Sequence, residues 1–147
     1  LMNSGHNIKS FVEGGGNFVV TYTTAGRNGT ELPTPLPVVI GRDRVTEEDA
    51  PITLSKHPIL SSPNEITSSD FNYWVQERGL YFPKSYEGFT EVLTITESTG
   101  TNYSNSTVVG HYGKGSVIYT GLSLFRELPA GVPGAIKLLQ NILHYDH

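Results

Sequence analysis

The first apolar positions of the chain change from helical to extended spacing at a run of three glycines. Ile8, Phe11 and Val12 are spaced as in the last turn of a helix, whereas the segment Asn17 to Tyr22 carries the continuous run Phe-Val-Val. Such a run is typical of a strand covered on both faces in a parallel sheet. Because the glycines precede the strand, we interpret them as a helix cap and not as a phosphate-binding loop.

The middle of the chain is predicted to be mostly turns and short strands. Residues 23–37 are loop, rich in Gly, Thr and Pro, and residues 57–71 are dominated by turn residues. A helix start is possible there at Ser68 or Ser69, with Asp70 in the first turn. Extended segments are predicted at 38–40, around Val45, Ile52 and Leu54, and at 89–97.

The clearest elements lie in the last third of the chain. Residues 106–122 read as two strands joined by the tetrapeptide Tyr-Gly-Lys-Gly, in which Gly113 and Gly115 would supply positive φ angles. A final helix begins at Pro133, since proline is tolerated at the first helical position. Its apolar face is predicted from helical spacing to hold Ala135, Ile136, Leu139, Ile142 and Leu143.

This order of elements predicts a three-layered α/β fold. A helix end followed by a buried strand is how a chain looks partway through such a fold, and the first strand or strands are not visible before Leu1. We therefore expect residues 1–147 to form a single domain that is a C-terminal fragment of a longer chain.

Composition excludes several classes of function. The net charge is -4 and the basic residues are scattered, with only Arg42 and Arg44 close together, which argues against a nucleic-acid partner. No apolar run is long enough to span a membrane. The absence of cysteine removes thiol nucleophiles, thiolate metal sites and disulfides, and it fits a bacterial periplasm as well as a cytoplasm.

Three stretches carry a resemblance to a known family. FVEGGGNFVVTY, the tripeptide HPI and HYGKGSVIYTGLSLFRELPAGVPGAIKLLQNIL resemble the class I glutamine amidotransferase-like fold. They resemble in particular the ThuA-like proteins and the domain that follows LmbE/PIG-L-type deacetylases of Bacteroidetes, and WVQERGLYFP is especially similar to the second group. The resemblance covers about Ile8 to Leu143 and implies a flavodoxin-like three-layer sandwich.

The resemblance also implies where a nucleophile would stand. In the amidotransferases a cysteine follows the strand that corresponds to Asn17–Tyr22, and a histidine activates it. Here Tyr22 or Thr23 occupies that region, and His111 is the candidate base, although a histidine hydrogen-bonded at the surface of a strand is the favoured interpretation. We therefore predict that this position carries no active nucleophile.

A metal site is not predicted either. The His-Pro-Asp-Asp motif that the resemblance implies for the deacetylase half is absent, because His57 and Pro58 are followed by Ile59. His6, His57 and His111 have no ligand spacing in the sequence, and the pair His144 and His147 fits a fraying terminus better than a metal site. We expect neither metal nor cofactor.

Aromatic and charged residues offer a second candidate site. Trp74 and Tyr81 could stack on a sugar while Glu77 and Arg78 bind its polar groups, and Arg126 is a further candidate. The alternative is that Glu77 and Arg78 form an ion pair that anchors a loop, and the same alternative applies to Arg126 with Glu127.

Two functions are compatible with these observations. The leading hypothesis is a non-catalytic accessory domain of an LmbE/PIG-L-type N-acetylglucosaminyl deacetylase, serving packing, assembly or the shaping of a carbohydrate site, in the bacterial periplasm or outside the cell. Its partner would be the catalytic domain of the same polypeptide, with a homodimer as a further possibility. The alternative is a stand-alone ThuA-like protein that binds or modifies carbohydrate and uses Glu77, His111 and Arg126 near the strand ends.

Overall fold

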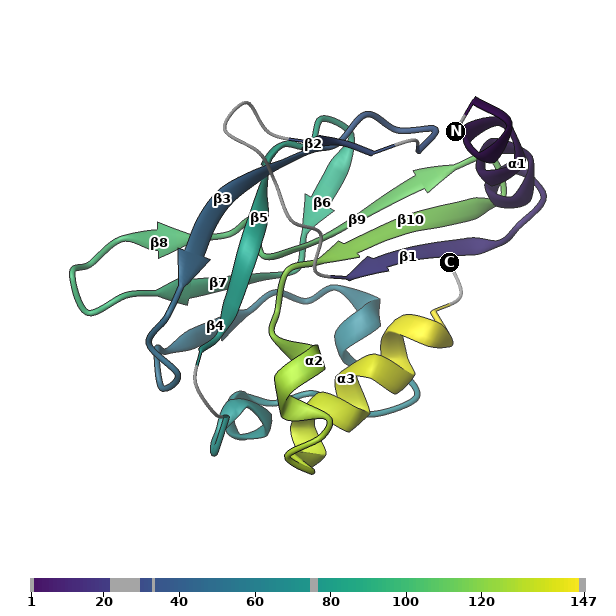
Figure 1. The fold of residues 1–147 in the computed structure, drawn as a ribbon. Coiled ribbons are helices and arrows are strands. Elements are labelled where there is room, and N and C mark those ends of the chain that lie inside the picture. The colour runs from purple at the N-terminus through teal and green to yellow at the C-terminus, as the bar shows by residue number, and fades with distance from the viewer. Residues whose placement is uncertain (1, 22–29, 33, 75–76, 146–147) are drawn as a thin grey trace.

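The computed structural model describes residues 2–21, 30–32, 34–74 and 77–145, in which three β-sheets pack with helices at two sides (Figure 1). The helical segments are α1 (Met2–Glu13), η1 (Pro58–Leu60), η2 (Ser68–Phe71), α2 (Leu124–Glu127) and α3 (Pro133–Leu143). The strands are β1 (Asn17–Thr21), β2 (Thr30–Glu31), β3 (Val39–Val45), β4 (Ile52–Leu54), β5 (Gly79–Ser85), β6 (Phe89–Glu91), β7 (Leu93–Thr96), β8 (Asn102–Tyr103), β9 (Thr107–Tyr112) and β10 (Gly115–Thr120).

The predicted flavodoxin-like three-layer sandwich is wrong. The strand orders are β1-β10-β9-β6, β2-β3-β5 and β4-β7-β8, and among these strands only β1 and β10 pair in parallel. Strand residues outnumber helical residues in the described part of the chain. The reason is that residues 30–103 contain short extended segments and 3₁₀ turns in place of the long amphipathic helices that crossovers between parallel strands require.

The sheet β1-β10-β9-β6 is covered on both faces at β9 and β10, whereas the apolar run of β1, which predicted a fully buried strand, is only half-buried. Val109 and Ile118 pack on the face that α3 covers, whereas Val108 and Tyr119 point to the opposite face, against Val38 and Ile40. This alternation explains why all six residues of β10 are buried. The second layer over this sheet is therefore largely β3 and its neighbours, where a flavodoxin-like fold would place helices.

The link between α1 and β1 is the predicted helix cap. The N–H groups of Gly14, Gly15 and Gly16 donate to carbonyls in the last turns of α1, and Gly15 has a φ of 113°. In the β9–β10 hairpin Gly113 has the expected positive φ (58°), but Gly115 does not. Gly115 is required for a different reason, since a Cβ there would lie 2.2 Å from the carbonyl oxygens of Val12 and Gly16.

Helix α3 starts at Pro133 as predicted, but its buried face differs from the prediction. Ile136 and Leu143 are exposed, while the buried residues are Gly134, Ala135, Leu138, Asn141 and Ile142. The face turns inward at a glycine and at an asparagine because the loop over 57–71 approaches it closely and needs polar partners. A Cβ at Gly134 would lie 1.8 Å from the carbonyl oxygen of Asp70.

The predicted strand over 89–97 is divided between two sheets. β6 pairs with β9, Val92 is fully buried, and β7 then pairs with β4 and β8.

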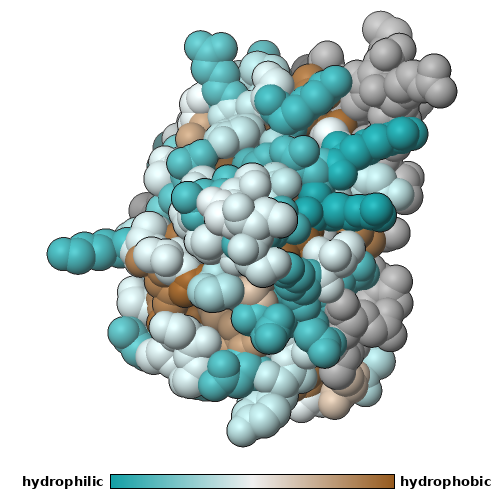
Figure 2. All heavy atoms as spheres, turned by 90° about the vertical axis from the view of Figure 1, so that its left-hand side faces the viewer, coloured by the Kyte–Doolittle hydropathy of each residue, from teal (hydrophilic) through white to brown (hydrophobic). Residues whose placement is uncertain are grey.

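Hydrophilic side chains cover most of the face on the β8 side of the molecule, and hydrophobic surface shows between them in its lower half (Figure 2).

Candidate functional site

The residues of the predicted nucleophile turn, Tyr22 and Thr23, lie outside the described residues. The described part of this strand ends at Thr21, which pairs with Thr120 of β10. Arg126 belongs to α2, and its side chain also lies outside the description.

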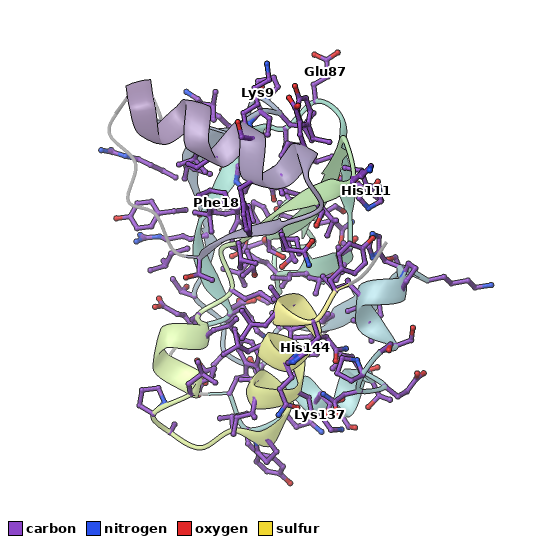
Figure 3. The ribbon with its side chains drawn as sticks, turned by 90° about the vertical axis from the view of Figure 1, so that its right-hand side faces the viewer. Lys9, Phe18, Glu87, His111, Lys137 and His144 are labelled. Carbon is purple, nitrogen blue, oxygen red and sulfur yellow. The ribbon has the colours of Figure 1, made fainter. Side chains whose placement is uncertain are left out.

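His111 lies at the exposed end of β9 and contacts a buried tyrosine (Figure 3). Its Nε2 is 2.8 Å from the hydroxyl oxygen of Tyr145, and the two rings are stacked with centroids 6.0 Å apart. The ring of His57 approaches the same tyrosine from η1, with centroids 5.6 Å apart. The fold thus brings together two histidines that the sequence analysis regarded as unrelated.

The remaining contacts of Tyr145 show that this cluster closes the end of α3 over the sheet. The side-chain amide of Asn17 donates to the Tyr145 carbonyl, and the Ser116 hydroxyl donates to Asn17 Oδ1 at 2.6 Å. Burial raises the pKa of Tyr145 above its usual value. The contacts of this cluster pack the segment after α3 against the sheet, in agreement with the interpretation of His111 as a hydrogen-bonded strand histidine.

We expect the free energy of unfolding to decrease as the pH is lowered, because of His57. Its Nδ1 accepts the N–H of Ile59 at 3.1 Å, which requires an unprotonated nitrogen. Burial, followed by the charge of His111, lowers the pKa of His57 below the usual 6.5. The stability that neutral His57 contributes is fully present above pH 6.5. It is lost as the pH falls from there toward the lower pKa of His57 in the folded state, because the unfolded chain binds the proton more readily.

The measurement is the urea midpoint between pH 5 and pH 8 for the parent chain and two variants. His57→Asn keeps an acceptor for the Ile59 N–H but does not titrate, so its midpoint should depend less on pH. His57→Ala should show the same reduced dependence at lower stability throughout. Equal pH dependence in the parent and in His57→Asn would contradict this account.

Glu77 and His111 do not meet. The Ser123 hydroxyl donates to the Glu77 carbonyl at 2.6 Å, just beyond the end of β10, whereas His111 pairs with Ser116 near the start of β10. The part of β10 from Ser116 to Thr120 alone spans about 13 Å, and Ser123 lies beyond its end. The predicted catalytic grouping of Glu77 with His111 is therefore not assembled.

Arg78 and Trp74 are buried and hold the loop after η2. The Arg78 guanidinium donates from Nε to the Ala50 carbonyl at 3.0 Å and from Nη1 to the Phe71 carbonyl. It also lies over the rings of Phe71 and Trp74, 5.9 and 5.8 Å from their centroids. Burial lowers the pKa of Arg78, which nearby Asp49 and Glu127 oppose. Arg78 thus anchors a loop, but through hydrogen bonds to the carbonyls of Ala50 and Phe71, where the alternative interpretation expected an ion pair with Glu77.

An open hollow lies above this anchored loop, and we call it the tyrosine hollow. It measures about 390 Å³ and is lined by Glu48, Asp49, Phe71, Asn72, Tyr73, Trp74 and Arg78. Tyr73 is 91% exposed and has a φ of 66°, an uncommon conformation for a residue other than glycine. A larger hollow of about 700 Å³ shares Glu48 and Asp49, so the two adjoin.

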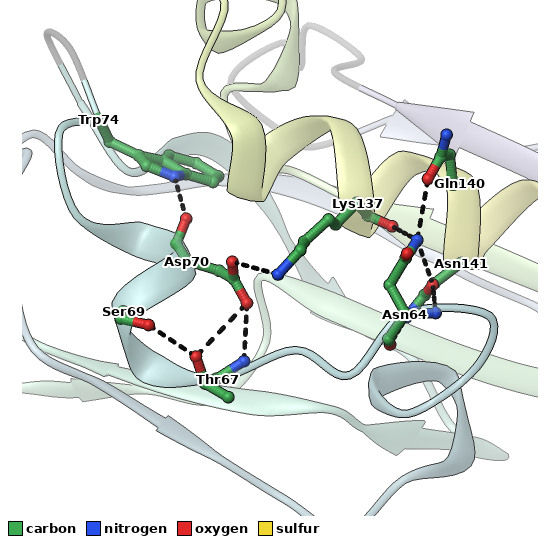
Figure 4. A network of polar contacts seen from close by, with 8 residues as sticks. All are labelled: Asn64, Thr67, Ser69, Asp70, Trp74, Lys137, Gln140 and Asn141. Atoms are coloured by element: carbon green, nitrogen blue, oxygen red, sulfur yellow. Dashed lines mark hydrogen bonds and ion pairs between the residues drawn. The ribbon is translucent and has the colours of Figure 1, made fainter.

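The base of the tyrosine hollow is rigidly supported (Figure 4). The Trp74 Nε1–H donates to the Asp70 carbonyl at 3.0 Å, and the Asp70 carboxylate accepts from the Thr67 N–H and from Lys137 Nζ. An exposed tyrosine thus projects from a fixed base beside two carboxylates. The sequence predicted Trp74 and Tyr81 as stacking faces but not Tyr73, although the place of Tyr73 next to Trp74 was a usable signal.

A second hollow, the arginine hollow, measures about 410 Å³ and is lined by Arg42, Arg44, Leu80 and Tyr81. The Leu80 N–H donates to the Gly121 carbonyl at 2.9 Å, so this hollow lies beside the carboxyl ends of β10 and of its parallel neighbour β1. The sequence analysis noted that the two arginines are close together but assigned them no role.

Other structural findings concern metals and membranes. Among residues 2–21, 30–32, 34–74 and 77–145, no group of three or more histidine or acidic side chains is placed to hold a metal ion. In the same residues, no helix has the length and apolar character needed to cross a membrane.

Comparisons with known proteins give one likeness of fold. No protein-family profile matches the chain, and no curated protein matches it. A solved structure, that of the β-galactosidase from Rahnella sp. R3, superimposes with a TM-score of 0.51 at 19% sequence identity, covering 94% of this chain and 21% of the β-galactosidase chain. This chain therefore spans about a fifth of that protein's length, and at this identity the likeness concerns the fold alone. It lends no support to the flavodoxin-like sandwich.

Proposed function

We propose that this chain is a non-catalytic accessory domain of a carbohydrate-acting protein of the LmbE/PIG-L deacetylase type, and that it contacts carbohydrate at the tyrosine hollow. The observation that carries the proposal is the exposed ring of Tyr73 beside Glu48 and Asp49 on an immobilised base. An aromatic face with a few convergent polar groups is the usual composition of a small-ligand site.

Two further observations support the carbohydrate assignment. The stretch WVQERGLYFP, which resembles the domain following such deacetylases, contributes Trp74 and Arg78 to the lining of this hollow. The β-galactosidase of similar fold is itself a carbohydrate-acting enzyme, and this chain corresponds to a part of it. The adjoining hollow lengthens the surface to a size suited to more than one sugar unit.

A stand-alone carbohydrate-modifying enzyme is less well supported. It required Glu77 and His111 to converge on one pocket, and they lie near opposite ends of β10. An accessory role requires only a contact surface, which the tyrosine hollow provides.

The test is a sugar titration that uses Trp74, the one tryptophan of the chain, as a fluorescent reporter inside the hollow. Oligomers of N-acetylglucosamine, of glucosamine and of galactose should be compared with sucrose. We expect a saturable change with at least one of the oligomers, at a Kd of about 1 mM. Unsaturated, equal responses to all sugars would refute the proposal.

Two substitutions of Tyr73 separate its ring from its backbone conformation. Tyr73→Asn removes the ring while asparagine tolerates the left-handed φ, and we expect about fivefold weaker binding, since ring stacking is worth about 1 kcal/mol. Tyr73→Phe retains the ring and should bind within about twofold of the parent. Equal affinity of Tyr73→Asn and the parent would exclude this tyrosine from the site.

A further inference from the structure

We propose that the arginine hollow is a second binding site, which takes an oxyanion carried by a ligand, either a carboxylate or a phosphate. Arg42 and Arg44 line it together with Leu80 and Tyr81, and the described lining residues include no acidic side chain. A guanidinium presents two parallel N–H donors that match a carboxylate or a phosphate. On a chain with a net charge of -4, this is a local concentration of positive charge.

The strand register shows how the hollow is built. Ile40 pairs with Pro83 and Asp43 with Phe82, so β3 advances three residues while β5 moves by one, and Gly41 and Arg42 fall outside the ladder. Asp43 then pairs with Phe82 and Val45 with Gly79, so that β5 contributes the surplus residues, Leu80 and Tyr81.

All four lining residues therefore lie between paired positions of the ladder, since Arg44 also stands between Asp43 and Val45. Bulges of this kind redirect side chains and are common beside active sites. Tyr81 has a φ of 55°, and such strained residues other than glycine cluster at ligand-binding positions.

The central sheet holds these bulges in place. The hydroxyl of Tyr119, a fully buried residue of β10, donates to the Tyr81 carbonyl at 2.6 Å. The Leu80 N–H is fixed by the Gly121 carbonyl. The carboxylate of Asp43, between the two arginines in sequence, accepts from the Asn105 amide at 3.3 Å and is not among the residues that line the hollow.

The position and charge of the arginine hollow distinguish it from the tyrosine hollow. The arginine hollow lies beside the carboxyl ends of β1 and β10. The tyrosine hollow has carboxylates on its rim and the arginine hollow has guanidinium groups, so the two favour groups of opposite charge.

The experiment is an NMR titration of the ¹⁵N-labelled chain with sodium glucuronate, inorganic phosphate, neutral glucose and sodium chloride at matched ionic strength. We expect saturable shifts of the Leu80 and Tyr81 amides, at a Kd of about 1 mM, with glucuronate, phosphate or both, and not with glucose. Saturation by glucuronate alone identifies a carboxylate ligand, and saturation by phosphate alone identifies a phosphate ligand. Unsaturated shifts equal to those from chloride would overturn the proposal.

Matched variants test the two arginines. Arg42→Gln and Arg44→Gln should each weaken binding at least tenfold, and Arg44→Lys should weaken it less, because lysine keeps the charge without the two-pronged geometry. Lys114→Gln removes one positive charge from the exposed β9–β10 turn and should leave the affinity within about twofold. Equal losses in all four variants would indicate general charge attraction and contradict a site. If a glutamine variant unfolds, the shifts mapped on the parent chain still decide the question.

Discussion

Replacing Asn141 by alanine is expected to lower the free energy of unfolding by about 3 kcal/mol, because it removes the side-chain hydrogen-bond partner of three backbone groups at once. The Asn141 amide donates to the carbonyls of Ile59 and Asn64 at 2.8 Å each, and its oxygen accepts the Asn64 N–H at 2.9 Å. Asn141 and Ile59 are almost completely buried, so water has little access to the carbonyl of Ile59 when the amide is removed. Urea denaturation followed by circular dichroism measures the loss.

Two neighbouring substitutions make the result specific. Gln140→Ala removes an exposed side chain whose oxygen accepts from the Asn64 amide, and it should cost no more than about 0.5 kcal/mol. Asn141→Asp keeps the acceptor but turns a carboxylate toward the Ile59 and Asn64 carbonyls, so it should be at least as harmful as alanine at neutral pH. If Gln140→Ala and Asn141→Ala were equally mild, the polar clamp between α3 and the loop would carry little of the stability.

Arg78→Leu should cost about 3–5 kcal/mol, for two reasons. It leaves the carbonyls of Ala50 and Phe71 without their donors, and both residues are almost completely buried. It also removes a cation that attracts Glu127, a fully buried residue whose carboxylate accepts from Ser123. The measurement is again the urea midpoint, with tryptophan fluorescence reporting on the loop through Trp74.

The expected order of the variants at this position is part of the prediction. Arg78→Lys keeps the charge near Glu127 but cannot reach both carbonyls, so it should fall between the parent and Arg78→Leu. Arg44→Leu removes an exposed arginine and should change stability by no more than about 0.5 kcal/mol. Full stability of Arg78→Lys would show that the hydrogen bonds to Ala50 and Phe71 are dispensable.

Local features of the fold were predictable from the sequence, and the pairing of distant segments was not. The β9–β10 hairpin and the start of α3 depend on neighbouring residues, and both are confirmed. The parallel neighbour of β1 is β10, which no periodicity in residues 17–21 can reveal. The buried face of α3 was predicted only in part. Ala135 and Ile142 are buried as expected, but the spacing missed Leu138 and could not indicate a buried glycine or asparagine.

The same limit applied to the candidate sites. His57 and His111 are separated by more than fifty residues and meet only because η1 and β9 both approach the end of α3. Arg42 becomes a lining residue through a shift of register, which depends on two strands and not on one. By contrast, a loop-anchoring role for Arg78 was available from the sequence, although the expected partner was Glu77 and the described partners are the carbonyls of Ala50 and Phe71.

The parallel pairing of β1 with β10 also sets an order of events during synthesis. The hydrogen bond between Asn17 and Ser116 joins residues 99 positions apart. At ordinary rates of translation about 5–20 s separate the appearance of these two residues, so β1 is made well before the strand that pairs with it in parallel. Contacts of such sequence separation also slow the refolding of a complete chain. Until β10 emerges, the apolar run of β1 lacks the strand that pairs with it, and this is the interval in which the nascent chain is most exposed to mispairing and aggregation.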